Sequence, residues 1–329
     1  MQQNIKSDYV LSMDFGGTKL AAAVINICTG NIISIARKKT PALQGAGATI
    51  NTMVEIGKEV LEQSELTDQI KRIGISFGGL VDKSQTTVLH SHHVEGWDGL
   101  VLTEIISNIF NLPTYMDNDV NAAALGEWYF GSGERAKNFI YIQISTGVGA
   151  GLILNKYLYR GEGLAGEFGH TTVIPDGPKC VCGRNGCIES LCSGWAIARD
   201  GKAALHTTTR DSLLWQLSNG LEDNIDAKLV IDAYRKNDPS AKAIIKRAFT
   251  NLAIPIANSI CLLDPEIVML GGGIAHAKDV ILEILEPVLE EQVHYIFKDR
   301  YRLVFSELNG QETLLGAALL SNNDEYINN

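Results

Sequence analysis

One histidine and three cysteines lie close together in the middle of the chain and form its clearest chemical pattern. They are His170, Cys180, Cys182 and Cys187. One imidazole and three thiolates make a closed tetrahedral ligand set that suits zinc. Gly183 and Gly186, which lie between the cysteines, allow the sharp turns that such a loop needs. The pattern predicts a structural zinc ion that shapes a loop. Cys192 is a rival ligand, which we assign instead to the helix that follows.

Three glycine-bearing turns follow strand-like runs and could bind phosphate. They are Asp14–Lys19, Thr146–Gly149 and Gly271–Gly273. Glycine has no Cβ, so the backbone amides of such turns can approach phosphate oxygens closely. Each turn alone is also compatible with a plain tight turn, and none matches a P-loop or a dinucleotide-binding fingerprint. Together the three turns predict a cleft that holds a nucleotide from two sides.

Carboxylates stand beside these features. Asp14 precedes the first turn, where it could hold magnesium through water, and an Asx-turn that fixes the hairpin is the alternative. Asn118 and Asp119 lie between a strand and a helix. Asp119 could act there as a general base, although spacing alone favours a helix N-cap. Glu167 and Glu189 bracket the cysteine cluster and offer acceptors for the vicinal hydroxyls of a sugar.

Three further histidines lie in a polar stretch with Trp97, at His90, His92 and His93. Three imidazoles could bind a metal, but no fourth ligand has suitable spacing. A solvated loop with one or two substrate contacts is the favoured interpretation.

Alternating strands and helices must position these groups. Apolar runs around the first turn, Tyr9–Asp14 and Leu20–Ile27, predict a hairpin, and Phe139–Ile144 and Ala150–Asn155 predict a second one. The likeness of the two hairpins indicates an internal duplication. Helical spacing of apolar residues predicts helices at Ala48–Leu66, Leu102–Phe110, Leu229–Lys236, Ala241–Leu263 and Val280–Tyr295. This alternation predicts an α/β fold.

Length and charge limit the possible functions. With 329 residues the chain is long enough for two lobes, and its net charge of −10 disfavours nucleic acid and anionic membranes as partners. No run reaches the roughly 18–20 apolar residues that span a bilayer. The segment Met1–Asp8 is polar and lacks the apolar core of a signal peptide, so we expect a cytoplasmic protein.

In order and number the motifs resemble those of the ROK family (repressor, open reading frame, kinase), over nearly the whole chain. The matching segments are Asp14–Lys19, Ser76–Asp82, Glu95–Gly99, Asn118–Ala122, Ser145–Gly151, Gly166–Glu189 and Leu270–Gly273. One departure is Leu80, where many members carry proline. The resemblance implies a two-lobed actin/hexokinase-like ATPase fold with duplicated ribonuclease H-like domains. It places residues 1–117 and a C-terminal helix at about 312–329 in the small lobe. Residues 118–311, with the zinc loop 167–189, form the large lobe.

The resemblance also implies an activity, the ATP-dependent phosphorylation of a hexose or N-acetylhexosamine at its 6-hydroxyl. Asp119 would be the catalytic base, and His170 would both ligate zinc and contact the sugar. The implied sugar ligands are Gly79, Asn118, Asp119, Glu167, His170 and Glu189. The implied nucleotide contacts are Asp14, Gly16, Gly17, Thr18, Lys19, Thr146, Gly147 and Gly272. Mg²⁺ would accompany ATP, and family habit favours a homodimer.

The choice of sugar and two rival functions stay open at this stage. Family base rates favour glucose, followed by N-acetylmannosamine or N-acetylglucosamine. A ROK-type transcriptional regulator would carry an N-terminal winged-helix domain, whereas only Met1–Asp8 precede the first strand here. A non-catalytic sugar sensor would lack the Asp119 carboxylate or the glycine turns, all of which are present.

Overall fold

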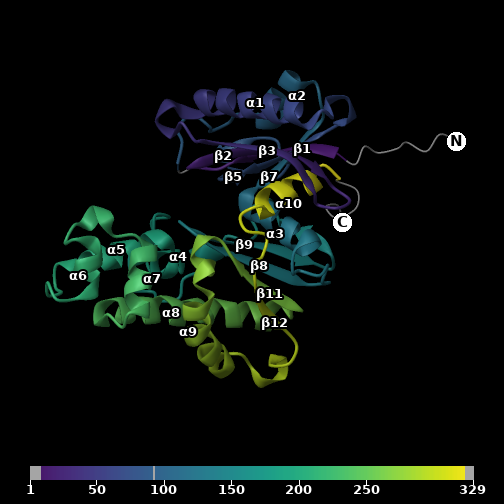
Figure 1. The fold of residues 1–329 in the computed structure, drawn as a ribbon. Coiled ribbons are helices and arrows are strands. Elements are labelled where there is room, and N and C mark those ends of the chain that lie inside the picture. The colour runs from purple at the N-terminus through teal and green to yellow at the C-terminus, as the bar shows by residue number, and fades with distance from the viewer. Residues whose placement is uncertain (1–8, 92, 323–329) are drawn as a thin grey trace. The chain divides into compact units, whose positions relative to one another are not determined.

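The computed structural model describes residues 9–91 and 93–322, and its backbone contacts separate them into two compact units. The first unit combines the described parts of Met1–Phe139 and Glu307–Asn329 with Gly151–Gly166. The second combines Ile140–Ala150 with Glu167–Ser306. These described residues form two five-stranded sheets and a short two-stranded one, with helices packed on them (Figure 1).

The first sheet has the strand order β3-β2-β1-β4-β7. Its strands are β1 (Tyr9–Phe15), β2 (Lys19–Asn26), β3 (Ile32–Lys39), β4 (Ile73–Phe77) and β7 (Thr114–Asn118). β1, β2 and β3 form an antiparallel meander, whereas β4 pairs in parallel with β1 and with β7. The parallel register aligns Asp14 with Ser76, and Ser76 with Asp117. Polar residues therefore gather at the carboxyl ends of the parallel strands, where open α/β sheets bind ligands.

The second sheet repeats this arrangement as β10-β9-β8-β11-β12. Its strands are β8 (Phe139–Ile144), β9 (Val148–Leu154), β10 (Tyr157–Tyr159), β11 (Ile267–Gly271) and β12 (Arg302–Phe305). β9 and β10 pair antiparallel, like their counterparts β2 and β3 in the first sheet. β11 and β12 pair in parallel, like their counterparts β4 and β7. The matching topologies confirm the α/β fold and the duplication that the two hairpins indicated.

Helices cover both faces of the first sheet (Figure 1). Leu11 and Met13 of β1 belong to the core cluster that includes residues of α1 (Gly45–Ser64) and α2 (Leu102–Phe110). Val10 belongs instead to the cluster formed with α10. β1 is therefore buried on both faces, as its nearly continuous apolar sequence requires.

The last helix packs against the third at very short range. α10 (Glu312–Leu320) is buried along its whole length, because its sequence is apolar on nearly every side. A Cβ added at Gly316 would lie 1.6 Å from the backbone oxygen of Ala122 in α3 (Asp119–Phe130). A Cβ added at Gly126 of α3 would lie 2.2 Å from a backbone oxygen of α10. Glycine at both positions lets the two helix backbones touch.

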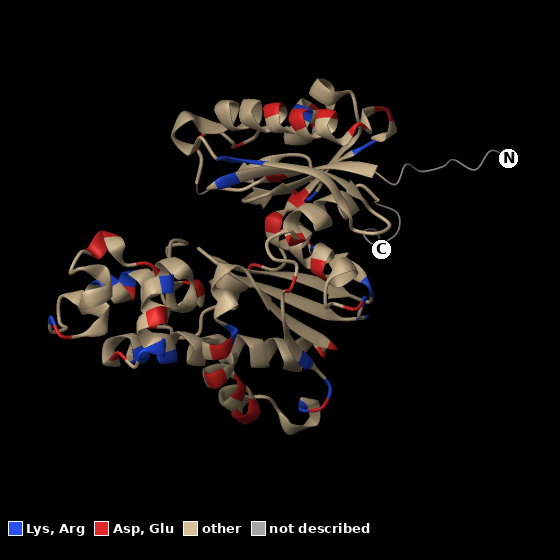
Figure 2. Cartoon of the chain, in the orientation of Figure 1, with Lys and Arg blue, Asp and Glu red and all other residues tan. Residues whose placement is uncertain are grey.

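The second unit is rich in helices. They are α4 (Glu189–Cys192), α5 (Gly194–Leu205), α6 (Leu213–Ser218), α7 (Ala227–Arg235), α8 (Pro239–Leu263) and α9 (Lys278–Gln292). Four of these helices have an N-cap residue whose side-chain oxygen accepts a hydrogen bond from a backbone N–H of the first turn. The four capping residues are Ser193, Ser212, Asp226 and Asp238. In Figure 2, basic positions alternate with acidic ones over these helices. No helix in residues 9–91 and 93–322 is long and apolar enough to cross a membrane.

The predicted elements are present, with shifted ends in several cases. α2 has the predicted bounds, whereas α9 ends at Gln292 and a short 3-10 turn, Tyr295–Phe297, follows it. β3 and the two-stranded hairpin of β5 (Leu80–Val81) and β6 (Val88–His90) were not predicted. Their alternation of exposed and buried residues is too weak to stand out in the sequence.

The division into units differs from the expected lobes over residues 118–139, 151–166 and 307–311. The resemblance assigned residues 118–311 to the large lobe, whereas backbone contacts group α3 and Gly151–Gly166 with the first unit. The backbone-to-backbone packing of α3 on α10 accounts for the grouping of α3 with the first unit. The part of the expected C-terminal helix beyond residue 322 lies outside the described residues.

The glycine contact between α3 and α10 predicts a large stability effect. We expect Gly316→Ala to lower the free energy of unfolding by about 2 kcal/mol or more, because the new Cβ forces the two helices apart. Gly47→Ala in α1 is the matched control, since a Cβ there meets no atom within 4 Å. The control should gain about 0.5–1 kcal/mol from its better helix propensity. Urea unfolding of both variants measures the effect, and equal stabilities would contradict it.

Candidate functional site

Asp14 lies at the carboxyl end of β1 and contacts two hydroxyl groups. Ser76 Oγ donates to its Oδ1 at 2.8 Å, and Thr313 Oγ1 donates to its Oδ2 at 3.3 Å. The carboxylate therefore reaches across to β4 and α10 and does not form the Asx-turn that was the alternative. Burial raises the pKa of Asp14 to about 6, and the two hydroxyls oppose this shift only in part. Asp14 is thus a half-buried carboxylate whose desolvation the two hydroxyls and the charge of Lys19 offset only in part.

The first glycine turn connects β1 to β2. A Cβ at Gly16 would lie 2.6 Å from the backbone oxygen of Lys19, and one at Gly17 would overlap the ring of His93. Thr40 Oγ1 donates to the backbone oxygen of Gly16 at 2.7 Å and fixes the turn from outside. Thr18 and Lys19 are exposed at the tip of the turn, where both can reach a ligand.

Asn118 and Asp119 lie at the junction of β7 and α3. Asn118 is the helix N-cap, since its Oδ1 accepts from the backbone N–H groups of Val120 and Asn121. Its Nδ2 donates to the backbone oxygen of Gly79 at 2.9 Å. Asp119 is the first residue of the helix, and its Oδ2 lies 3.7 Å from where a Cβ on Gly78 would be. The capping role that spacing assigned to Asp119 therefore belongs to Asn118.

The second glycine turn, in the second unit, is held by an acidic side chain. Glu189 is nearly buried, and its Oε2 accepts from the backbone N–H of Val148 at 3.1 Å. A Cβ at Gly147 would lie 2.7 Å from the same oxygen. Gly147 is therefore needed to let this carboxylate approach the turn, a reason that the sequence alone did not reveal.

A cavity of about 320 Å³ lies beside the second and third glycine turns. The third turn touches the end of β8, because Gly272 has a positive φ of 84° and lies against the backbone of Ile144. The cavity is lined by Ser145, Thr146, Gly194, Trp195, Ala198, Ile225, Asp226, Ala227, Lys228, Gly273 and Ile274. A flat aromatic face, aliphatic walls and a few polar groups suit a purine base.

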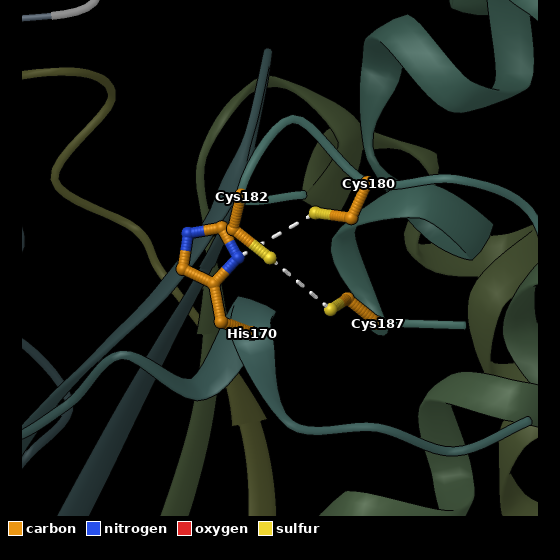
Figure 3. Close-up of side chains that lie close together, drawn as sticks. All are labelled: His170, Cys180, Cys182 and Cys187. Carbon is orange, nitrogen blue, oxygen red and sulfur yellow. Dashed lines mark hydrogen bonds between the residues drawn. The ribbon is translucent and has the colours of Figure 1, made fainter. Parts of the chain in front are cut away.

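The histidine and three cysteines of the predicted metal site do converge (Figure 3). Their ligand atoms all lie within 4.8 Å of one another. The Cys180 Sγ–His170 Nδ1 and Cys182 Sγ–Cys187 Sγ distances are both 3.6 Å. Metal–sulfur bonds of about 2.3 Å and metal–nitrogen bonds of about 2.0 Å put tetrahedral ligand atoms about 3.5–3.8 Å apart. The sulfurs are too far apart for a disulfide, and all six cysteines are free.

Burial and hydrogen bonds act in opposite directions on the thiols of this loop. The backbone N–H and side chain of Arg184 lower the pKa of the Cys182 thiol to about 6, while burial raises the pKa of the Cys180 thiol to about 12. His170 turns Nδ1 toward the sulfurs, and its Nε2 lies 3.7 Å from Glu167 Oε2. Burial raises the pKa of Glu167, and the charge of nearby Glu189 raises it further. The two ring nitrogens of His170 thus face a metal-binding pocket and a carboxylate, respectively.

The predicted site residues fall into two groups, one in each unit. The first unit holds Asp14, Gly16, Gly17, Thr18, Lys19, Gly79, Asn118 and Asp119. The second holds Thr146, Gly147, Glu167, His170, Cys180, Cys182, Cys187, Glu189 and Gly272. Sequence reasoning missed Thr313 and the cavity residues Trp195, Asp226 and Lys228, since these come from helices without a recognisable motif.

The histidine stretch is divided among different roles. His90 Nδ1 lies 3.2 Å from Asp98 Oδ1, and His93 packs over Gly17. His92 lies outside the described residues. Among the described residues the metal-binding geometry is found at the cysteine loop and not at these histidines.

Comparison with known proteins places the chain in a family. Residues 10–324 match the ROK family, so the chain belongs to this family. It is 31% identical over 323 residues to a glucokinase of Streptomyces coelicolor, covering 96% of this chain and 98% of that protein. It is 33% identical over 315 residues to an N-acetylmannosamine kinase of Yersinia pseudotuberculosis, and this match covers 94% of this chain and 97% of that protein.

A solved structure supports the same fold. The crystal structure of a ROK family glucokinase from Streptomyces griseus in complex with glucose and AMPPNP superimposes with a TM-score of 0.83 and 30% identity. The match covers 96% of this chain and 99% of that one. The fold is therefore the two-lobed actin/hexokinase-like fold that the motifs implied.

The raised pKa of Asp14 predicts an unusual pH effect on stability. The folded-state pKa of about 6 lies above the ordinary 3.8, so folding favours the protonated carboxyl of Asp14. The contribution of this group to the free energy of unfolding is therefore fully present below pH 3.8 and is lost as the pH rises through 6. We therefore expect Asp14→Asn to raise the Tm at pH 8 by a few degrees and to have little effect at pH 4. Asp279→Asn is the control, since Arg235 lowers the pKa of Asp279 and the variant should lower the Tm at pH 8. If both variants destabilise equally at pH 8, the assignment for Asp14 is wrong.

Proposed function

We propose that this protein is an ATP-dependent sugar kinase that phosphorylates the 6-hydroxyl of a hexose or N-acetylhexosamine, with glucose as the first candidate. The observation that carries the proposal is the setting of Asp119. It occupies the first turn of α3 beside the Gly78–Gly79 turn, while Asn118 performs the capping. Membership of the ROK family and the similarity to kinases along nearly the full chain support it.

Asp119 is assigned the general base. The positive end of the α3 dipole favours its charged form, and a carboxylate can accept the proton of an attacking hydroxyl. Asn118 and Gly79 of the first unit are assigned to the sugar, together with Glu167, His170 and Glu189 of the second. Their carboxylates, amide and imidazole offer the acceptors and donors that hydroxyl groups need.

ATP is assigned to the glycine turns. Gly16, Gly17, Thr18 and Lys19 supply backbone amides, a hydroxyl and a cation for phosphates, and Asp14 can hold Mg²⁺ through water. Thr146, Gly147 and Gly272 border or support the cavity that suits the adenine base. Mg²⁺ would neutralise charge on the transferred phosphoryl group, while the protein's own task is positioning.

Zinc is assigned to the cysteine loop, because the four ligand atoms have the spacing that a tetrahedral ion needs. With all four positions filled by the protein, the ion would act as a structural support. His170 Nδ1 would bind the metal, which leaves Nε2 for the sugar or for Glu167. The metal loop would then form part of the sugar site.

Two finer assignments are also proposals. N-acetylmannosamine is the second candidate substrate, because a kinase for this sugar is among the relatives that match nearly the full chain. We also propose a cytoplasmic homodimer. The alternative of a non-catalytic sugar sensor is disfavoured by the retained Asp119 and glycine turns.

The kinase assignment is tested by a coupled ADP-release assay across hexoses and N-acetylhexosamines. We expect activity with at least one sugar, and a loss of about 100-fold or more in kcat for Asp119→Asn. Binding of AMPPNP to the variant should be retained, since the cavity lies in the second unit. Full activity of Asp119→Asn would refute the general-base role, and inactivity of the wild type on every sugar would favour the sensor.

Metal content tests the zinc assignment separately. We expect about one zinc per chain by elemental analysis in the wild type and much less in Cys187→Ser, with a lower Tm. Cys261→Ser is the matched control, because Cys261 is an exposed thiol of α8. Equal zinc contents in the two variants would exclude the cysteine loop as the site.

A further inference from the structure

A buried ion pair lies immediately before Asn118 and Asp119 in the first unit. Arg160 Nε donates to Asp117 Oδ2 at 2.6 Å, and the two side chains are only 11% and 1% exposed. By contrast, the side chains of the Arg235–Asp279 pair in the second unit are 39% and 63% exposed. A charge pair so deeply buried costs desolvation and is weak evidence for stability, so another role has to be considered.

The other oxygen of Asp117 holds the segment that carries the proposed base. Asp117 Oδ1 accepts from the backbone N–H of Asn118 at 2.7 Å and from Asn121 Nδ2 at 2.9 Å. Asn118 and Asn121 lie on either side of Asp119, at the start of α3. The two oxygens of a carboxylate are rigidly linked, so Arg160 fixes Oδ1 by holding Oδ2.

Arg160 also organises the loop that follows β10. Its backbone oxygen accepts from the N–H groups of Gly163 at 2.8 Å and Ala165 at 3.1 Å. The loop turns at Gly161, Gly163 and Gly166, which all have positive φ. Glu167 comes next in the sequence. A single residue therefore ties the start of this loop to the end of β7.

We infer that Arg160 is a positioning residue for phosphoryl transfer, acting through Asp117 on the placement of Asn118 and Asp119. The inference rests on the proposed function. A base and a sugar ligand must be held to within a fraction of an ångström, and supporting contacts of this kind supply that precision. In this account Arg160 acts on the placement of Asn118 and Asp119 through the Asp117 carboxylate.

Kinetics of Arg160 variants test the inference. We expect Arg160→Met to lower kcat about 10- to 100-fold and to raise the KM for the sugar, because small misplacements of reacting groups have effects of this size. AMPPNP affinity, measured by calorimetry without sugar, should stay at the wild-type value. Arg160→Lys should recover part of kcat, since lysine keeps the cation but lacks the planar guanidinium geometry. Arg235→Met is the control for loss of an arginine–aspartate pair and should keep wild-type kinetics.

The outcomes separate positioning from simple stabilisation. A lower Tm for Arg160→Met with unchanged kcat and unchanged sugar KM would overturn the inference. If Arg160→Met does not fold, Arg160→Lys decides: a reduced kcat with a raised sugar KM supports positioning, and wild-type values overturn it. The double variant Arg160→Met/Asp117→Asn removes both charges, and a recovered Tm with kcat still low would support positioning further. Recovery of both to wild-type values would overturn it.

The assay of Asp119→Asn in parallel distinguishes this inference from the proposed function. An active wild type, an inactive Asp119→Asn and an Arg160→Met with wild-type kinetics would remove only the role of Arg160. A wild type inactive on every sugar would remove the proposed function, and with it the inference. An active wild type with impaired Asp119→Asn and Arg160→Met variants and a normal control supports both.

Discussion

The backbone contact of α10 with its neighbours is the constraint on which the first unit depends. The helix has glycine at Gly316, where it meets α3, and it faces a second glycine, Gly74, on β4. A Cβ at Gly74 would lie 1.8 Å from the backbone oxygen of Ala317. The same helix accepts a hydrogen bond from Ser12 Oγ at 2.6 Å, through the backbone oxygen of Leu314. One helix from the end of the described chain therefore fixes β1, β4 and α3, the elements that carry Asp14, Ser76 and Asp119. Because α10 contacts these elements backbone to backbone, they have little room to shift, and their positions determine where the three side chains lie.

This compact arrangement creates an electrostatic problem, because β1, β7 and α3 bring three carboxylates to the same end of the sheet. Each is accommodated differently. Asp117 is buried and paired with Arg160, and Asp119 lies in the first turn of a helix, whose dipole favours negative charge. Asp14 accepts hydrogen bonds from two hydroxyls, and burial raises its pKa to about 6. The least compensated carboxylate is thus the one that a bound cation would help most, which agrees with its proposed role toward Mg²⁺.

The sequence predicted well those features whose signal is local. The zinc ligands, the two hairpins and the helix at Leu102–Phe110 each depend on residues close in the chain, so spacing and periodicity reveal them. The partners that hold the site in place were not predictable in this way. Arg160 meets Asp117 from a loop after another sheet's strand, and Thr313 meets Asp14 from the last helix. Nothing in the sequence around Arg160 distinguishes it from the arginines that are exposed. The roles proposed for Asp119 and the sugar ligands come from family resemblance, because spacing alone is also compatible with a helix cap.

In the second unit the segment after Cys187 contacts the second glycine turn as well as carrying the proposed sugar ligand Glu189. Glu189 follows Cys187 by two positions, and its carboxylate holds the second glycine turn through the N–H of Val148. Two residues beyond the short helix α4, Gly194 donates its backbone N–H to Ser145 at the start of that turn. The segment from Cys187 to Gly194 therefore connects the metal-binding pocket to the turn proposed for phosphate. A metal held by His170 and Cys187 would fix both residues, and through the segment from Cys187 to Gly194 it would also stabilise the turn. The proposed phosphate turn and the proposed sugar ligand Glu189 would then depend on the same metal.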